Sequence, residues 1–232
     1  MSELSKPSVA TPVDSNRPSP LSRDHAYIQN HPAPAYWALS PYLIHQHTDA
    51  SCSLATATML LNGARALDDA GRLGEFIGER SLLDRLGDAH WRQEITPPDG
   101  NGLSTEELVG KLERCLGHYG LSGWSVTPHL VAAADRPTAD TFRRELALME
   151  RTSDRLIGAN YHLATTYGDD WDIGHFSPIG AYDSDSDRVL LLDVWKEDYE
   201  PCWLPLERLL AGMAIPSAKT GALRGYLVLK RA

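Results

Sequence analysis

The sequence has no apolar run long enough to span a membrane, and its N-terminal segment lacks the hydrophobic stretch that a signal peptide requires. We therefore expect a cytoplasmic protein. Basic residues are also scarce: 22 Lys and Arg against 31 Asp and Glu give a formal net charge of -9 at pH 7. Nucleic acids and anionic membranes bind through basic surfaces, so neither is expected as a partner.

Cysteine is equally sparse. The chain has three, Cys52, Cys115 and Cys202, which are far apart and show none of the CxxC or CxxH spacings of a structural zinc site. Dispersed cysteines in an odd number are typical of free thiols in a reducing compartment. His45 and His47 alternate on an extended segment and could share a metal ion, but no third ligand is evident. We expect no resident metal or cofactor.

The length sets the domain count. At 232 residues the chain can bury one substantial core but hardly two. Residues 1–22 are rich in Ser, Pro and Asn and have almost nothing to bury, which predicts a disordered tail. One folded domain is expected over residues 23–232.

Hydrophobic periodicity divides this domain into two kinds of segment. Apolar residues at helical spacing predict a largely buried helix from Cys52 to about Ala70. Ser104 and Glu107 form a capping-box pattern that predicts the start of a second helix, and a third is expected over residues 138–150. Short apolar runs bounded by turn residues follow at 154–164, 174–183, 187–195 and 225–231, with one helical piece at 205–213. Helices first and a mainly antiparallel sheet afterwards predict an α+β fold.

Two polar residues lie on the two arms of a predicted hairpin. The turn is DSDSD, residues 183–187, and facing residues around a turn centred on Asp185 have index sums of 370. His175 and Asp193 sum to 368, so we expect them to be neighbours on one face. A carboxylate inside VLLLDVW also needs a hydrogen-bonding partner, which an imidazole can supply.

Cys52 can complete a nucleophilic triad with this pair. A carboxylate that orients a histidine, and a histidine that takes a proton from a thiol, are the parts of such a triad. Thr48, Asp49 and Ser51 mark a helix start at Cys52, where short polar side chains satisfy first-turn amides and the helix N-terminus favours a thiolate. Gln46 could donate to an oxyanion together with the backbone N–H of Cys52. Acyl transfer is the predicted reaction class.

Taken singly, each of these residues has an ordinary structural interpretation. A lone cysteine in an apolar helix usually serves packing, a strand histidine is often a structural group, and a glutamine before a helix is usually a loop residue. The joint pattern favours catalysis. For Cys115 and Cys202, packing is the better interpretation.

The sequence resembles the phytochelatin synthase family, a branch of the papain-like cysteine peptidases that acts as a dipeptidyl transferase on glutathione. The resemblance is strongest over residues 174–213, which begin GHFSPIGAYD, and in QHTDASCSLA, which matches the family's nucleophile motif. It implies a papain-like fold, with a helical lobe containing the nucleophile helix packed against the sheet lobe. It also implies that Cys52 is the nucleophile, His175 the general base and acid, Asp193 its orienting carboxylate and Gln46 the oxyanion donor. A homodimer is suggested by the resemblance as well.

The departures from the family pattern concern substrate recognition. The family has Gly after the nucleophile, where this chain has Ser53, and arginine after a Tyr-His pair, where the pair beginning at Tyr161 is followed by Leu163. Lys196 replaces an arginine three residues beyond the catalytic aspartate, which keeps the charge but loses the bidentate fork, whereas Tyr199 matches. By resemblance, we expect Ser53, Tyr161, Lys196 and Tyr199 at the substrate site.

Three functional hypotheses follow. The first is a γ-glutamylcysteine dipeptidyl transferase or glycine-releasing hydrolase that acts on glutathione-like thiol peptides in metal detoxification, with a heavy-metal ion entering only as part of a thiolate substrate. The second is an amide-forming acyltransferase of small-molecule biosynthesis with a thioester or amide donor, which Leu163 favours. The third is a non-catalytic papain-like binding module, which the intact set Gln46, Cys52, His175 and Asp193 disfavours.

Overall fold

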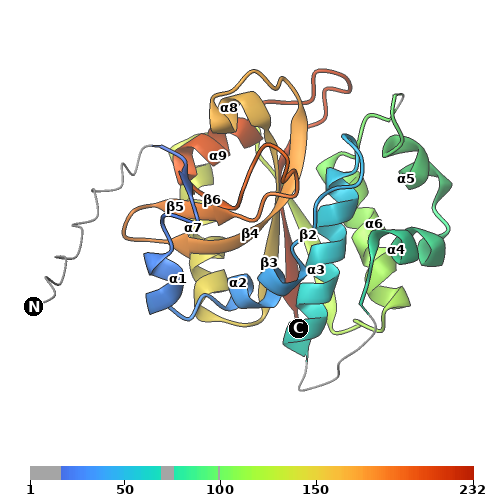
Figure 1. Ribbon diagram of the computed structural model, residues 1–232, viewed down its shortest axis with the longest axis horizontal. Helices are drawn as coiled ribbons and strands as arrows, with labels where there is room; N and C mark the ends of the chain where they lie inside the picture. The colour runs from blue at the N-terminus through green and yellow to red at the C-terminus, as the bar shows by residue number, and fades with distance from the viewer. Residues whose placement is uncertain (1–16, 69–75, 99) are drawn as a thin grey trace, which may run out of the picture.

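The computed structural model describes residues 17–68, 76–98 and 100–232. Within these ranges, seven strands form one antiparallel sheet in the order β1-β6-β5-β4-β3-β7-β2 (Figure 1). The strands are β1 (Ser19–Pro20), β2 (Trp124–Leu130), β3 (Arg155–His162), β4 (Gly174–Asp183), β5 (Arg188–Leu191), β6 (Cys202–Pro205) and β7 (Gly225–Arg231). The central strands β3 and β5 are buried along their whole length, which requires helices on both faces of the sheet.

α3, from the first half of the chain, packs on one face of the sheet, and α7 covers the other (Figure 1). A Cβ added to Gly158 in β3 would lie 3.1 Å from Leu60 of α3, whereas the next residue, Ala159, pairs with Tyr226, whose ring lies 4.5 Å from that of Phe142 in α7. The described helices are α1 (Ala26–Asn30), α2 (Pro34–Leu39), η1 (Ser40–Tyr42), α3 (Cys52–Asp68), α4 (Glu79–Leu86), α5 (Ala89–Glu94), α6 (Thr105–His118), α7 (Arg136–Arg151), α8 (Leu163–Tyr167) and α9 (Leu206–Met213). The predicted α+β class is confirmed.

The three long helices were predicted from the sequence, and the third begins two residues earlier than expected. α3 starts at Cys52 and is described to Asp68, and the last residues of the predicted helix lie outside the described ranges. Ser104 caps α6 through a capping box with Glu107, as its sequence pattern indicates. The predicted third helix corresponds to α7, which Asp135 caps by accepting a hydrogen bond from the Thr138 amide.

Several elements were not predicted. β2 lies within the helical half of the chain and pairs with β7 at the sheet edge, where its Pro128 is tolerated because one side of an edge strand makes no ladder bonds. α4 and α5 span only 8 and 6 residues, too few for a clear helical period. The expected order of helices followed by strands is therefore only approximate.

The predicted tail extends too far into the chain. Ser19 and Pro20 pair with β6, and the Leu21 amide donates to the Pro201 carbonyl. These are backbone interactions, so a segment with few apolar side chains can still join the sheet. The ordered domain therefore begins before residue 22, and residues 1–16 lie outside the described ranges.

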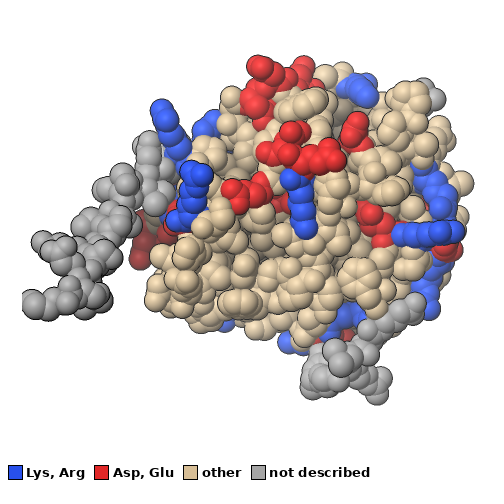
Figure 2. All heavy atoms as spheres, viewed as in Figure 1, with Lys and Arg blue, Asp and Glu red and all other residues tan. Residues whose placement is uncertain are grey.

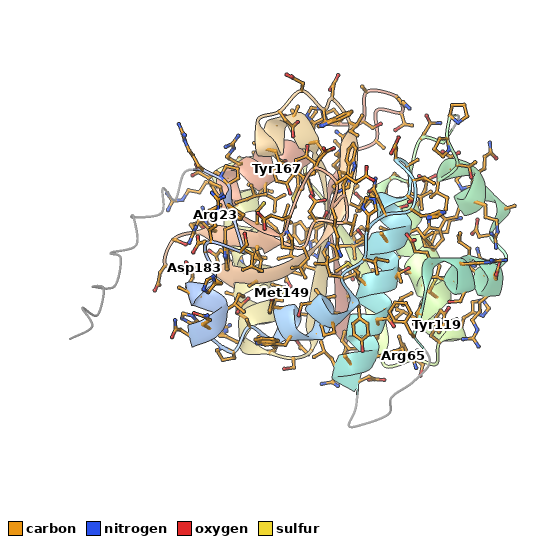
Figure 3. All side chains as sticks on the ribbon, in the orientation of Figure 1. Arg23, Arg65, Tyr119, Met149, Tyr167 and Asp183 are labelled. Atoms are coloured by element: carbon orange, nitrogen blue, oxygen red, sulfur yellow. The ribbon has the colours of Figure 1, made fainter. Side chains whose placement is uncertain are left out.

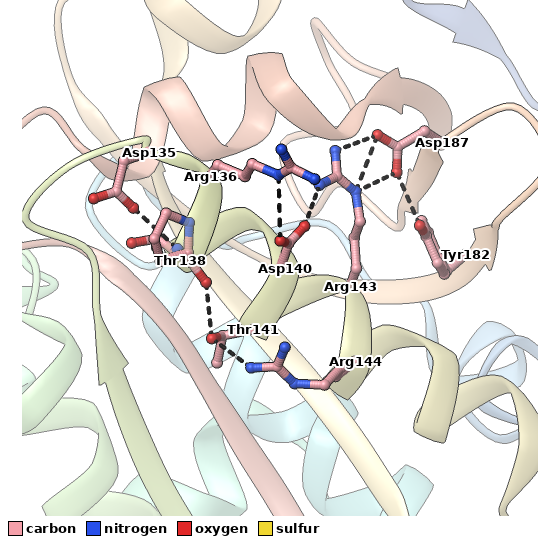
Figure 4. A network of polar contacts seen from close by, with 10 residues as sticks. Asp135, Arg136, Thr138, Asp140, Thr141, Arg143, Arg144, Tyr182 and Asp187 are labelled. Atoms are coloured by element: carbon pink, nitrogen blue, oxygen red, sulfur yellow. Dashed lines mark hydrogen bonds and ion pairs between the residues drawn. The ribbon is translucent and has the colours of Figure 1, made fainter.

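The hairpin that carries His175 and Asp193 is anchored at its turn. The Asp187 carboxylate accepts hydrogen bonds from Arg143 of α7, at 2.7 Å, and from the Tyr182 hydroxyl, at 2.8 Å (Figure 4). Asp187 itself has a φ of 51°, in the left-handed region. The acidic turn is thus held against α7 by an ion pair.

Charged side chains are unevenly distributed over the surface. Figure 2 shows acidic side chains gathered at the top of the view, over α8 and the segment that follows it, which contains the exposed Asp170 and Asp172. The lower part of the same face is largely uncharged. In the described ranges, no helix combines the length and the apolar character that crossing a membrane would require.

Candidate active site

His175 and Asp193 meet as the hairpin argument predicts. The His175 Nε2 lies 2.9 Å from the Asp193 Oδ1, and both side chains are almost completely buried. Near the turn, the residue numbers of each facing pair in β4 and β5 add up to 371. If this register continued, Asp193 would face Pro178, and its side chain would lie on the opposite face of the sheet from that of His175. A β-bulge between Ile179 and Ala181 shifts the sum to 370 and brings the carboxylate to the His175 face.

Four donors surround the Asp193 carboxylate. Oδ1 accepts from His175 and from the Trp195 amide at 2.8 Å, and Oδ2 accepts from the hydroxyls of Tyr161 and Tyr167, at 2.8 and 2.7 Å. Burial alone would raise the pKa of Asp193, but the charge and hydrogen bond of His175, with the Tyr167 and Trp195 bonds, lower it below its ordinary value. The carboxylate is therefore ionised at neutral pH.

The His175 imidazole lies between this carboxylate and the Cys52 thiol. Burial alone would lower the pKa of His175, but the charge and hydrogen bond of Asp193 and the hydrogen bond with Cys52 raise it above its ordinary value. Because Nε2 is bonded to Asp193, Nδ1 is the nitrogen left for the thiol. The ring centroids of Trp195 and His175 are 6.1 Å apart, with the two planes at 45° to each other.

Cys52 is the first residue of α3, and its side chain is 7 % exposed. The helix start differs in detail from the expected cap, because the Ser51 hydroxyl accepts from the Thr48 amide and donates to the Thr48 carbonyl instead of serving the first turn. The Ser51 carbonyl accepts from the amides of Leu54 and Ala55 and so begins the helix. The thiol faces a cavity at this helix end.

Gln46 lies beside the triad with its side-chain amide unused. Its backbone N–H donates to the Val194 carbonyl, which ties the loop before α3 to the residue after Asp193. The side chain is 3 % exposed, and neither its nitrogen nor its oxygen has a hydrogen-bond partner within the described ranges. A buried amide without a partner costs free energy, which is typical of a group that awaits a ligand.

The cavity beside Cys52 has a volume of about 570 Å³. Its walls come from the start of α3, the α5–α6 region, the ends of β3 and β4, and residues 215–224. Arg224 is its most deeply buried cation, 7 % exposed, and was missed from the sequence although it immediately precedes the last strand. Its guanidinium donates to the carbonyls of Ile215 and Pro216, and among the described residues no carboxylate forms an ion pair with it.

The four residues expected at the substrate site, Ser53, Tyr161, Lys196 and Tyr199, are not among those that line the cavity. Tyr161 is fully buried beneath the triad, Ser53 is fully buried and accepts from the Trp91 indole, and the Lys196 ammonium donates to the Leu43 carbonyl. Tyr199 stacks on Tyr167 with ring centroids 4.3 Å apart. These residues were assigned from a linear motif, which does not indicate the direction in which each side chain points.

Two further sequence observations are resolved. Leu163, which replaces the family's arginine, is the first residue of α8 and is completely buried. His45 accepts from the Lys196 amide through Nδ1 and lies 3.6 Å from Glu197. In the part of the chain that the structure describes, no three His, Cys, Asp or Glu side chains are grouped so that they could hold a metal ion.

Comparisons with known proteins show which family the chain resembles. The family model described as phytochelatin synthase matches residues 7–226. Glutathione gamma-glutamylcysteinyltransferase 1 of Lotus japonicus is 30 % identical over 206 residues, which cover 88 % of this chain and 37 % of the relative. Glutathione gamma-glutamylcysteinyltransferase 2 of Arabidopsis thaliana is also 30 % identical, over 84 % of this chain and 40 % of its own length. The chain thus spans well under half the length of these relatives.

Proposed function

The chain belongs to the phytochelatin synthase family, and from its cysteine site we propose that it transfers the γ-glutamylcysteinyl group of glutathione through a thioester on Cys52. The observation that carries the proposal is the chain of hydrogen bonds from Cys52 through His175 to Asp193, with Cys52 at the wall of a cavity that also contains a buried guanidinium. We infer the identity of the acyl group from the relatives, which are named glutathione gamma-glutamylcysteinyltransferases.

In the first half-reaction, the Cys52 thiol gives its proton to His175, and the sulfur attacks the carbonyl carbon between the cysteinyl and glycine residues of glutathione, so that a C–S bond forms. The resulting oxyanion accepts hydrogen bonds from the Gln46 amide and the Cys52 backbone N–H. His175, held as an imidazolium by Asp193, gives its proton to the glycine nitrogen as the C–N bond breaks. Glycine leaves, and the γ-glutamylcysteinyl thioester remains.

In the second half-reaction, an amine or water attacks the thioester carbonyl, His175 takes the proton of the nucleophile, and the C–S bond breaks. A second glutathione as acceptor extends the peptide, and water releases γ-glutamylcysteine. A heavy-metal ion enters, where it takes part, as a component of a thiolate acceptor.

Arg224 supports a substrate with a carboxylate. The Arg224 guanidinium is 7 % exposed, donates to two neutral carbonyls and forms no ion pair among the described residues; Asp172 of the same cavity interacts with it electrostatically but is hydrogen-bonded to His162. A charged group in this environment favours an anionic ligand, and the guanidinium fork matches a carboxylate. The family has an arginine at the position of Leu163, and its absence here disfavoured glutathione as the substrate. Arg224 can supply a cation in its place.

We expect replacement of Arg224 by methionine to raise KM for glutathione about 10- to 100-fold, the scale of a charge-assisted hydrogen bond, with a smaller effect on kcat. Steady-state glycine release over a range of glutathione concentrations measures both constants. Arg136→Met, which removes an exposed guanidinium from α7, is the matched control. An unchanged KM would remove Arg224 from the substrate site.

We expect Gln46→Met to lower kcat about 10²- to 10³-fold, as for loss of one oxyanion donor. The variant should keep or raise its melting temperature, because methionine fills the same space without a buried amide that lacks a partner. Glycine release and thermal unfolding are the two measurements. A normal kcat, or a large loss of stability, would show that the amide serves the fold instead.

The proposed function is tested by incubating the protein with glutathione, with and without Cd²⁺, and assaying free glycine and thiol peptides by chromatography with mass detection. Glycine together with γ-glutamylcysteine or an extended γ-glutamylcysteine peptide is the expected result. If no glycine appears under either condition, glutathione is not the acyl donor.

A further inference from the structure

The two tyrosines that hold the far side of the Asp193 carboxylate have no part in the steps above. We propose that Tyr161 and Tyr167 are positioning residues that fix Asp193 in the one orientation from which it can hold His175 toward Cys52. The inference rests on the proposed function, because it concerns the same triad.

The hydrogen bonds divide cleanly between the two carboxylate oxygens. Oδ1 accepts from His175 at 2.9 Å and from the Trp195 amide at 2.8 Å, and Oδ2 accepts from the phenols of Tyr161 and Tyr167 at 2.8 and 2.7 Å. The carboxylate group is completely buried, so no solvent can replace a lost donor. Rotation about its Cβ–Cγ bond would break all four bonds, and the phenols therefore help to keep Oδ1 on the histidine.

Both phenols can act only as donors to this carboxylate. Burial, followed by the charge of Asp193, raises the pKa of Tyr161 and of Tyr167 well above the ordinary value, so both hydroxyls keep their protons. Each tyrosine also has contacts other than Asp193. Tyr161 lies on β3 opposite His175, and its hydroxyl is also 3.1 Å from that of Ser177.

Tyr167 is fixed by a second layer of contacts. It ends α8, in the upper part of the molecule where Figure 3 labels it, and stacks on Tyr199 at an interplanar angle of 17°. The Tyr199 hydroxyl is bonded to Asp169, and the Cys202 thiol lies 3.8 Å from the Tyr167 hydroxyl. This arrangement gives the family-matched Tyr199 a role behind the triad, as the support of a residue that orients Asp193.

The test compares wild type with Tyr161→Phe, Tyr167→Phe and the double variant. Tyr182→Phe is the matched control, because it removes a phenol hydroxyl bonded at 2.8 Å to a different aspartate, Asp187. Two assays run in parallel: glycine release from glutathione, and the pH dependence of Cys52 alkylation by iodoacetamide. The second assay does not depend on the identity of the substrate.

We expect each active-site variant to lower kcat about tenfold, the scale of one hydrogen bond to a charged group, with KM nearly unchanged. The acid limb of both pH profiles should move upward by about one pH unit, because a carboxylate with fewer donors takes up its proton at higher pH. The other titratable groups that face Asp193 are His175, Cys202 and Tyr199, and the Phe variants leave all three in place.

If the acid limb and kcat of the three variants match those of Tyr182→Phe, the positioning role is wrong. If the alkylation limb moves but wild type releases no glycine from glutathione, the positioning role stands and the proposed substrate fails. Thermal unfolding of each variant identifies any loss of fold, and should the double variant not fold, the single variants decide.

Discussion

Replacing Cys52 by alanine should abolish glycine release, lowering kcat/KM by at least about 10⁴-fold, because the acyl-enzyme cannot form without the sulfur. The side chain is small and nearly buried at the first turn of α3, so alanine fits the space and the melting temperature should change little. Steady-state kinetics and thermal unfolding measure the two effects.

The other cysteines provide the matched control. Burial raises the pKa of the Cys115 and Cys202 thiols to about 12, so both are protonated and unreactive at neutral pH. Cys115→Ala should retain full activity, and brief alkylation of the native protein should modify Cys52 alone. Activity that survives in Cys52→Ala would rule out covalent catalysis at this residue.

Replacing Asp193 by asparagine should lower kcat about 10³- to 10⁴-fold, because an amide cannot stabilise the imidazolium that donates a proton to the leaving glycine. It should also destabilise the fold by about 3–5 kcal/mol, as expected for breaking a buried ion pair. One amide oxygen cannot accept from every donor that now surrounds the carboxylate.

The stability difference between wild type and Asp193→Asn should depend on pH at both ends. The pKa of Asp193 is lowered in the folded state, so its contribution is complete above the unfolded value of 3.8 and is lost as pH falls through the folded value. The pKa of His175 is raised, so its contribution is complete below 6.5 and is lost as pH rises through the folded value. Chemical denaturation should therefore show the largest difference between these two values, and a difference that is constant from pH 4 to 9 would contradict the ion pair.

The triad was predictable because it depends on local rules. Capping residues located the start of α3 at Cys52, and alternation along a hairpin placed His175 near Asp193. The success of the second argument depended on a feature that the sequence did not reveal, the bulge at Gly180, without which Asp193 would face the other side of the sheet. The turn is centred half a residue beyond Asp185, the centre assumed from the sequence. The bulge restores the assumed index sum of 370.

The cavity beside Cys52 was much less predictable, because it is assembled from segments far apart in the chain. Arg224 reaches the cavity from the loop before β7, a strand that lies two places from β4 in the sheet and about fifty residues later in sequence than His175. Tyr161 matched a family motif, yet the β3 register turns its hydroxyl toward Asp193 and away from the cavity. A sequence motif can thus indicate that a residue belongs to the site without showing which groups its side chain contacts.

The most direct test of the account is the intact mass of the protein after brief exposure to glutathione, with acid quenching and reductant in the work-up to remove mixed disulfides. The account predicts a species heavier by one γ-glutamylcysteinyl group, which peptide mapping locates on Cys52 and which is absent from Cys52→Ala. Wild-type protein that releases glycine while its mass stays unmodified, or that carries the group on another residue, would contradict the thioester on Cys52.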